Sequence, residues 1–175
     1  MKKTRAVIFA VLLMVTLTVC RTKPNSVGAA AGGDINALDA VIIVDMVELA
    51  SDTPPHTVKS SSGDDIIMVP AQGVFEAAGY RTVWVPEEQR LEVYESSGGN
   101  LAYVFVIGHP VAWFVIYAEE LNEFLNGEEQ LLSPAVLING KEFIPLHFIT
   151  GRVGFRWDCA VDSGDIYLFS PAGVF

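Results

Sequence analysis

Residues 67–81 read IMVPAQGVFEAAGYR, and residues 142–156 read EFIPLHFITGRVGFR. Each stretch has a proline that is followed nine positions later by a glycine: Pro70 and Gly79, and Pro145 and Gly154. Proline suits the first turn of a helix, where its missing N–H would have no partner, and glycine can take the positive φ with which many helices end. Each stretch therefore predicts a strand that leads into a short helix.

The two predicted helices carry the same apolar stripe. Its members recur at i, i+3 and i+7, and they are Ala71, Val74 and Ala78 in the first helix and Leu146, Ile149 and Val153 in the second. This spacing predicts that one face of each helix is buried. A tryptophan and an alternating strand follow each glycine: Trp84 with residues 91–94, and Trp157 with residues 166–169. We therefore expect an α+β fold, with an antiparallel β-sheet wrapped around short helices and two copies of a strand-helix-strand-strand unit.

Turn-forming residues divide the rest of the chain. Asn139-Gly140 predicts a type I′ hairpin, because both residues readily take positive φ. Gly108, His109 and Pro110 predict another turn between two strands. Residues 40–47 predict a buried strand, and residues 51–65 a mobile loop. Residues 118–125 fit either one extra helix or an acidic loop.

The first residues have the features of an export signal. Lys2, Lys3 and Arg5 precede an uncharged apolar run over residues 6–19, which is shorter than the roughly 20 residues that span a bilayer. Ala29 and Ala31 satisfy the small-x-small rule for cleavage. We expect a signal peptide over residues 1–31, a disordered leader over residues 32–39, and a single domain over residues 40–175 of a secreted or cell-surface protein.

Two other outcomes of processing stay open. The residues before Cys20 are similar to a lipobox, so the chain could be lipidated there, although Val19 is bulkier than the small residue normally required. The apolar run could also be retained as an N-terminal anchor. Membrane contact is expected only through the signal segment or through lipidation at Cys20.

The chain is acidic, with 11 Lys and Arg residues against 21 Asp and Glu residues. Removal of residues 1–31 would leave six basic side chains and a net charge of −15. A charge of this sign repels nucleic acid, which is therefore excluded as a partner. Cleavage would also leave Cys159 as a lone thiol, so no disulfide is expected in the mature chain.

Residues 137–149, LINGKEFIPLHFI, are followed by Gly154 and Trp157-Asp158. This pattern resembles the signature of the copper amine oxidase N-terminal-like domain, or stalk domain, and the resemblance covers about residues 40–170. The chain departs from it at His147, where the family usually has Arg, at Gln72 in the first unit, and at Val85 after the first tryptophan. The signature residues are Pro70, Gly79, Trp84, Asn139, Gly140, Pro145, Gly154, Trp157 and Asp158.

The resemblance implies an antiparallel sheet that wraps a helix, in exported proteins of Gram-positive bacteria. It implies no copper chemistry, because the stalk domain is separate from the catalytic domain of the oxidases. We therefore expect a non-catalytic binding or spacer module of the cell envelope, with a cell-wall component or another exported protein as its partner. The alternatives are a small secreted hydrolase of wall glycan or peptide, and a soluble inhibitor or regulatory subunit.

Residue types that could carry chemistry are present but scattered. His56, His109 and His147 contain no His-x-His pair, so no metal ligand and no cofactor is predicted. Asp162-Ser163-Gly164 has the letters of the aspartic-protease triplet, but the first unit has no second triplet, and a turn is expected instead. Cys159 has no C-x-x-C partner and is expected to be a bystander.

Two larger groups of side chains have a structural interpretation as well. The acidic residues could supply the carboxylate pair of a glycosidase, but a solvated face is expected; they are Glu119, Glu120, Glu123, Glu128 and Glu129. The aromatic residues could form a sugar-stacking platform, but core or cross-strand positions are expected; they are Trp84, Trp113, Trp157, Tyr94, Tyr103, Tyr117, Phe114 and Phe155. No catalytic residue is predicted.

Overall fold

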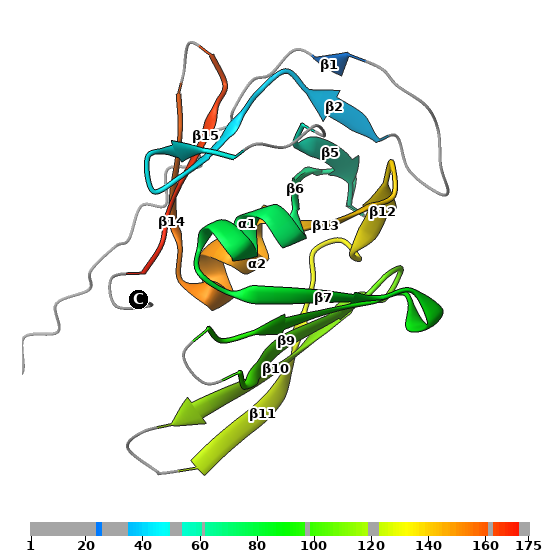
Figure 1. Cartoon of the computed structure of the whole chain (residues 1–175). Helices are drawn as coiled ribbons and strands as arrows, with labels where there is room; N and C mark the ends of the chain where they lie inside the picture. Colours follow the sequence, from blue (N-terminus) through cyan, green and yellow to red (C-terminus); the bar gives the residue numbers. More distant parts are fainter. Residues whose placement is uncertain are drawn as a thin grey trace, which may run out of the picture.

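A computed structural model of the chain describes residues 24–25, 35–49, 54–60, 62–96, 99–118, 123–160 and 163–171. The predicted signal peptide lies outside these ranges except for Pro24–Asn25, and Cys20 and Ala31 lie outside them too. Within these ranges, three β-sheets surround two short α-helices (Figure 1). The structure is mostly antiparallel sheet with a small helical part, which agrees with the expected α+β class.

The six-stranded sheet carries the strands that lead into both helices. Its order is β1 (Pro24–Asn25), β2 (Asn36–Leu38), β5 (His56–Lys59), β6 (Asp65–Pro70), β13 (Lys141–Pro145) and β12 (Val136–Ile138), and all neighbours are antiparallel. β6 and β13 pair through their last three residues, with Pro70 opposite Phe143 and Met68 opposite Pro145. This pairing places the starts of the two helices side by side.

Both predicted helix starts and both predicted helix ends are observed. α1 (Ala71–Ala77) begins after Pro70, and α2 (Leu146–Phe148) begins after Pro145. Gly79 and Gly154 have φ angles of 81° and 89°, which glycine takes without a Cβ clash. The second helix differs from the expectation, because after three α-helical residues it continues as a π-helix, η2 (Ile149–Val153).

The five-stranded sheet is an up-and-down meander. Its order is β11 (Glu123–Gln130), β10 (Val111–Ala118), β9 (Leu101–Val106), β8 (Arg90–Tyr94) and β7 (Arg81–Val85), and the short 3-10 helix η1 (Pro86–Glu88) joins β7 to β8. The interpretation of residues 118–125 as a helix or an acidic loop is wrong for Ala118 and residues 123–125, because they belong to β10 and β11; residues 119–122 lie outside the described ranges. These two strands pair along their whole length, from Val111 opposite Gln130 to Ala118 opposite Glu123.

The four-stranded sheet has the order β14 (Arg156–Cys159), β15 (Ile166–Phe169), β3 (Ile42–Val44) and β4 (Val47–Glu48). β15 and β3 are parallel, although more than a hundred residues separate them in the chain. The strand predicted over residues 40–47 is interrupted, because Asp45 and Met46 both take positive φ and turn the chain back into β4.

Two segments that were expected to be irregular contain strands. β5 lies in the predicted mobile loop over residues 51–65, and β2 lies in the predicted leader over residues 32–39. β5 pairs with both β2 and β6 and buries His56 and Val58 on one face. Pairing with two neighbouring strands stabilises the extended conformation of β5, although turn-forming residues flank this short strand.

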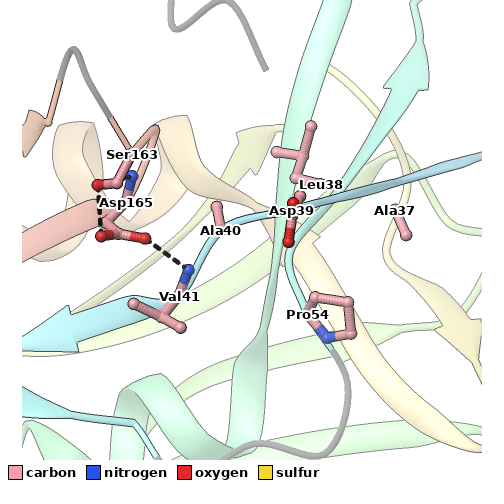
Figure 2. Close-up of a pocket in the computed structure, with 8 residues that line it drawn as sticks. All are labelled: Ala37, Leu38, Asp39, Ala40, Val41, Pro54, Ser163 and Asp165. Atoms are coloured by element: carbon pink, nitrogen blue, oxygen red, sulfur yellow. Dashed lines mark hydrogen bonds between the residues drawn. The ribbon is translucent and has the colours of Figure 1, made fainter. Parts of the chain in front are cut away.

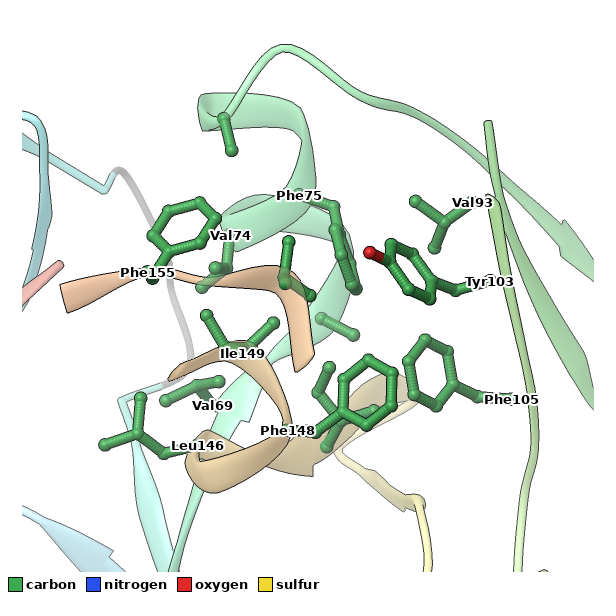
Figure 3. Close-up of a cluster of buried hydrophobic side chains, with 14 of the residues drawn as sticks. Val69, Val74, Phe75, Val93, Tyr103, Phe105, Leu146, Phe148, Ile149 and Phe155 are labelled. Atoms are coloured by element: carbon green, nitrogen blue, oxygen red, sulfur yellow. The ribbon is translucent and has the colours of Figure 1, made fainter. Parts of the chain in front are cut away.

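The main core lies between the helices and the sheets. Val74 of α1 and Ile149 of η2 are fully buried, which confirms the predicted apolar stripe (Figure 3). Phe148 packs edge-on against Phe105 of the five-stranded sheet, with ring centroids 4.9 Å apart. A second cluster on the six-stranded sheet contains Val58, Met68, Ile138 and Phe143.

The Asn139-Gly140 hairpin is confirmed. The two residues have φ angles of 53° and 79°, as a type I′ turn requires, and they join β12 to β13 with Ile138 opposite Lys141.

Among the described residues, none of the helices combines the length and the hydrophobicity that crossing a bilayer requires.

Candidate binding site

An open groove of about 460 Å³ lies where three segments distant in sequence meet. One wall is the chain from the end of β2 to the start of β3, and the others are Pro54, before β5, and the turn that precedes β15 (Figure 2). The lining residues are Ala37, Leu38, Asp39, Ala40, Val41, Pro54, Ser163 and Asp165. Its volume falls in the usual range of sites for small ligands.

Asp165 fixes the shape of this groove. One carboxylate oxygen accepts a hydrogen bond from the Val41 N–H at 3.0 Å, and the other accepts one from the Ser163 hydroxyl (Figure 2). The Ile166 N–H donates to the Val41 carbonyl at 2.9 Å. Both oxygens of Asp165 therefore hold the wall of the groove in place, and the carboxylate acts as a structural acceptor.

The groove offers a mixed surface for recognition. Asp39 and Ser163 are exposed and supply a carboxylate and a hydroxyl, while Val41 and Pro54 supply exposed apolar surface. A smaller hollow of about 130 Å³ shares Ala40, Val41 and Pro54 with it. The two hollows together form an open surface that presents both hydrogen-bonding and apolar groups.

The three histidines lie on separate elements. His56 is buried on β5 with its ring edge-on to Phe143, His109 is exposed in the turn after β9, and His147 belongs to α2. Burial lowers the pKa of His56, and a backbone hydrogen bond with Pro54 opposes this shift. Within the described ranges, no three side chains of His, Cys, Asp or Glu converge to hold a metal ion.

Glu128 and Glu129 of β11 do not face each other as a carboxylate pair. Glu128 and Glu129 are adjacent on the strand, so their side chains leave opposite faces. Glu128 accepts a hydrogen bond from the Trp113 indole N–H at 3.1 Å. Glu119 and Glu120 lie outside the described residues.

The Asp-Ser-Gly stretch forms a turn where the structure describes it. Gly164 has a φ of 79°, and its N–H donates to the Ala160 carbonyl at 2.7 Å, while Asp162 lies outside the described residues. Cys159 is buried and disulfide-bonded. The lone thiol stays a prediction for the chain from which residues 1–31 have been removed.

The aromatic side chains are distributed over different parts of the fold. Tyr103 and Phe155 are buried, and Trp84 packs against the core. The Phe114 ring lies under the Arg152 guanidinium, at 3.4 Å from its central carbon to the ring centroid. Trp157 is 39% exposed, at the edge strand β14. The Tyr117 side chain lies outside the part of the chain that can be described.

The signature residues have structural positions. The two prolines and the glycines after the helices delimit α1 and the α2–η2 segment, and Asn139-Gly140 forms a hairpin turn. Asp158 accepts a hydrogen bond from the Cys159 N–H at 2.8 Å. None of these residues lines the groove.

The groove is a site that the sequence did not reveal. Its walls come from residues 37–41, Pro54 and residues 163–165, which meet only after the parallel pairing of β15 with β3. The signal available in the sequence was the clustering of turn formers at Pro54-Pro55 and Ser163-Gly164-Asp165. No family model, no curated protein and no solved structure matches the chain.

Proposed function

We propose that the chain is a non-catalytic, exported binding or spacer module of the bacterial cell envelope, built on a stalk-type domain. Its export depends on the signal peptide over residues 1–31, and the mature protein is secreted or held at the cell surface. Its partner is a cell-wall component or another exported protein. The groove between β2, β3 and the turn before β15 is its recognition surface.

One observation carries this proposal: the residues shared by the two Pro-to-Gly segments are structural. Val74 of α1 and Ile149 of η2 are fully buried in the same hydrophobic cluster. Pro70 and Pro145 directly precede α1 and α2. This arrangement supports a duplication, in which β6, α1, β7 and β8 correspond to β13, the α2–η2 segment, β14 and β15. Because these residues form the core, we expect the protein to recognise its partner through its loops.

The location of the groove supports a role in binding. It is formed by connecting segments rather than by the packed faces of the sheets, and Asp39, Val41, Pro54 and Ser163 are exposed in it. The acidic surface favours ligands that are neutral or positively charged. An extended wall peptide or glycan meets these conditions.

Export is tested by the intact mass of the protein recovered from a secreting Gram-positive host. We expect a mature N-terminus at Gly32. A diacylated Cys20 would show that the chain is processed as a lipoprotein and is not cleaved after Ala31. A chain that keeps its first residues would contradict export by cleavage.

Binding is tested by co-sedimentation with purified cell wall. We expect the wild-type chain to sediment with the wall, and Asp39→Lys and Val41→Arg to lose most of this binding. Val47→Arg is the matched control, since Val47 is 68% exposed and lies outside the groove. Equal binding of all variants would exclude the groove as the binding surface.

Two other outcomes would favour the alternative functions. Release of reducing ends or peptides from the wall would favour a hydrolase, and crosslinking to a single stoichiometric protein partner would favour a regulatory subunit.

A further inference from the structure

The connection between β11 and β12 is tied to α2 by a histidine. The Leu132 N–H donates a hydrogen bond to Nε2 of His147, at 3.3 Å. Two backbone bonds hold the same connection, from the Leu131 N–H to the Pro110 carbonyl and from the Gly108 N–H to the Ala135 carbonyl, both at 2.8 Å. Of these three bonds, only the one to His147 involves a group that titrates near neutral pH.

This bond requires a neutral imidazole. Nε2 can accept the Leu132 N–H only while it keeps its lone pair, so the ring proton is on Nδ1. Nδ1 is buried and has no hydrogen-bond partner among the described residues. An imidazolium would direct its new Nε2–H toward the Leu132 N–H, while the Nδ1–H stays buried without an acceptor, as it is in the neutral ring. Protonation therefore breaks the bond and leaves a charge in a poorly solvated position.

Among the described residues, few charged groups belong to the elements packed around the ring. Residues 131–135 carry no ionisable side chain, and the carboxylate that acts on His147 is Glu129 of β11, which favours the charged ring. Arg152 of η2 lies over the Phe114 ring. On the other neighbouring strands the charged residues are Asp65, which pairs with Lys59, and Lys141 and Glu142 at the start of β13. Burial lowers the pKa of His147 in spite of Glu129.

We propose that His147 is an acid-sensitive latch, whose protonation releases residues 131–135 from α2. The latch is closed while the imidazole is neutral. It opens as the pH falls below the ordinary range of histidine, and the connection between the five-stranded and six-stranded sheets then loosens. Leu131 and Ala135 are buried at the two ends of this connection, so the loosening exposes a local part of the core rather than unfolding the chain.

Amide hydrogen exchange of the full chain tests the latch. Between about pH 7.5 and about pH 5, corrected for intrinsic exchange, we expect protection at Leu132 to fall about tenfold or more. His147→Gln can still accept the bond but does not titrate, so its protection should be independent of pH. His109→Gln, at an exposed histidine, should keep the wild-type profile. The same acid-induced loss in His147→Gln as in the wild type would overturn the proposal.

A second measurement tests the latch even if His147→Gln folds poorly. NMR titration of the wild-type His147 ring should show a neutral form with the proton on Nδ1, and a midpoint below the ordinary histidine value of 6.5. Glu129→Gln should move the His147 midpoint to lower pH, because it removes the carboxylate that favours the charged ring. A neutral ring protonated on Nε2, or a midpoint at or above 6.5, would contradict the latch.

Discussion

The Phe114 ring on β10 lies directly over Gly127 on β11, so that a Cβ on residue 127 would come within 2.5 Å of the ring's Cζ atom. The Arg152 guanidinium lies over the face of the same ring, with its central carbon 3.4 Å from the ring centroid. The ring thus joins the edge of the five-stranded sheet to η2. Gly127 is required here because of space, since it lies in an extended strand.

Gly127→Ala should therefore destabilise the protein. The added methyl group cannot be accommodated unless the Phe114 ring moves off Arg152, and overpacking of this kind costs about 1–3 kcal/mol. Urea unfolding followed by tryptophan fluorescence measures the loss. Phe114→Leu in the same chain should recover part of it, because the smaller side chain makes room for the methyl group.

Gly151→Ala is the matched control for this prediction. Gly151 lies in η2, and a Cβ there would meet no atom within 4 Å. This substitution should leave the stability unchanged or raise it by up to about 1 kcal/mol, since alanine restricts the unfolded chain. Equal destabilisation by both alanines would show that the contact with Phe114 is unimportant.

Phe148 connects the second helical segment to the five-stranded sheet. Its ring is 1% exposed and lies edge-on to both Phe105 and Tyr103, at 4.9 and 5.5 Å between centroids. Phe148→Ala should lower the free energy of unfolding by about 3–5 kcal/mol, because it removes these contacts and leaves a cavity. Met46→Ala, at a side chain that is 75% exposed, should change it by less than about 0.5 kcal/mol.

The turn between β3 and β4 contains two non-glycine residues with positive φ, 48° at Asp45 and 68° at Met46. The Asp45 carboxylate holds the turn, because it accepts bonds from the Ser170 N–H at 2.9 Å and the Ser170 hydroxyl at 2.6 Å. Met46→Gly should raise stability by about 1 kcal/mol through relief of the left-handed conformation. Asp45→Ala should lower it by about 1–3 kcal/mol. Thermal unfolding of the two variants, compared with the wild type, would reveal any reversal of these signs.

The parts of the fold that were predictable have strong local determinants. Asn139-Gly140 can hardly form anything but a tight turn, and the Pro70-to-Gly79 spacing fixes where α1 begins and ends. The periodicity around Val74 and Ile149 identified the buried faces. In each case the conformation depends on residues within a few positions along the chain.

The parts that were missed depend on distant partners. The sequence EFLNGEEQ of β11 has the composition of a loop, and it becomes a strand because β10 pairs with all eight of its residues. The Asp45-Met46 turn has no glycine or asparagine to mark it, and it is fixed by Ser170, 125 residues away. The groove depends on the bond from Val41 to Asp165, which also joins distant parts of the chain.

The buried His56 should make the stability of the protein sensitive to acid. Burial lowers the pKa of its imidazole below the ordinary value of 6.5, so the folded state favours the neutral ring while the unfolded chain takes up a proton near 6.5. The free energy of unfolding should therefore be highest above this pH and should decrease as the pH falls from 6.5 toward the lower pKa of the folded state. Urea unfolding at a series of pH values measures the decrease.

His56→Leu separates the contribution of His56 to the acid sensitivity of folding from that of His147. His56→Leu keeps the contact with Phe143 and Met68 but removes the titrating group, so its stability should decrease less than that of the wild type over the same pH interval. His109→Leu should show the full wild-type decrease, because His109 is exposed in the turn after β9. If His56→Leu and the wild type lose equal stability with acid, the neutral form of His56 contributes nothing to folding, and the acid sensitivity belongs to other groups.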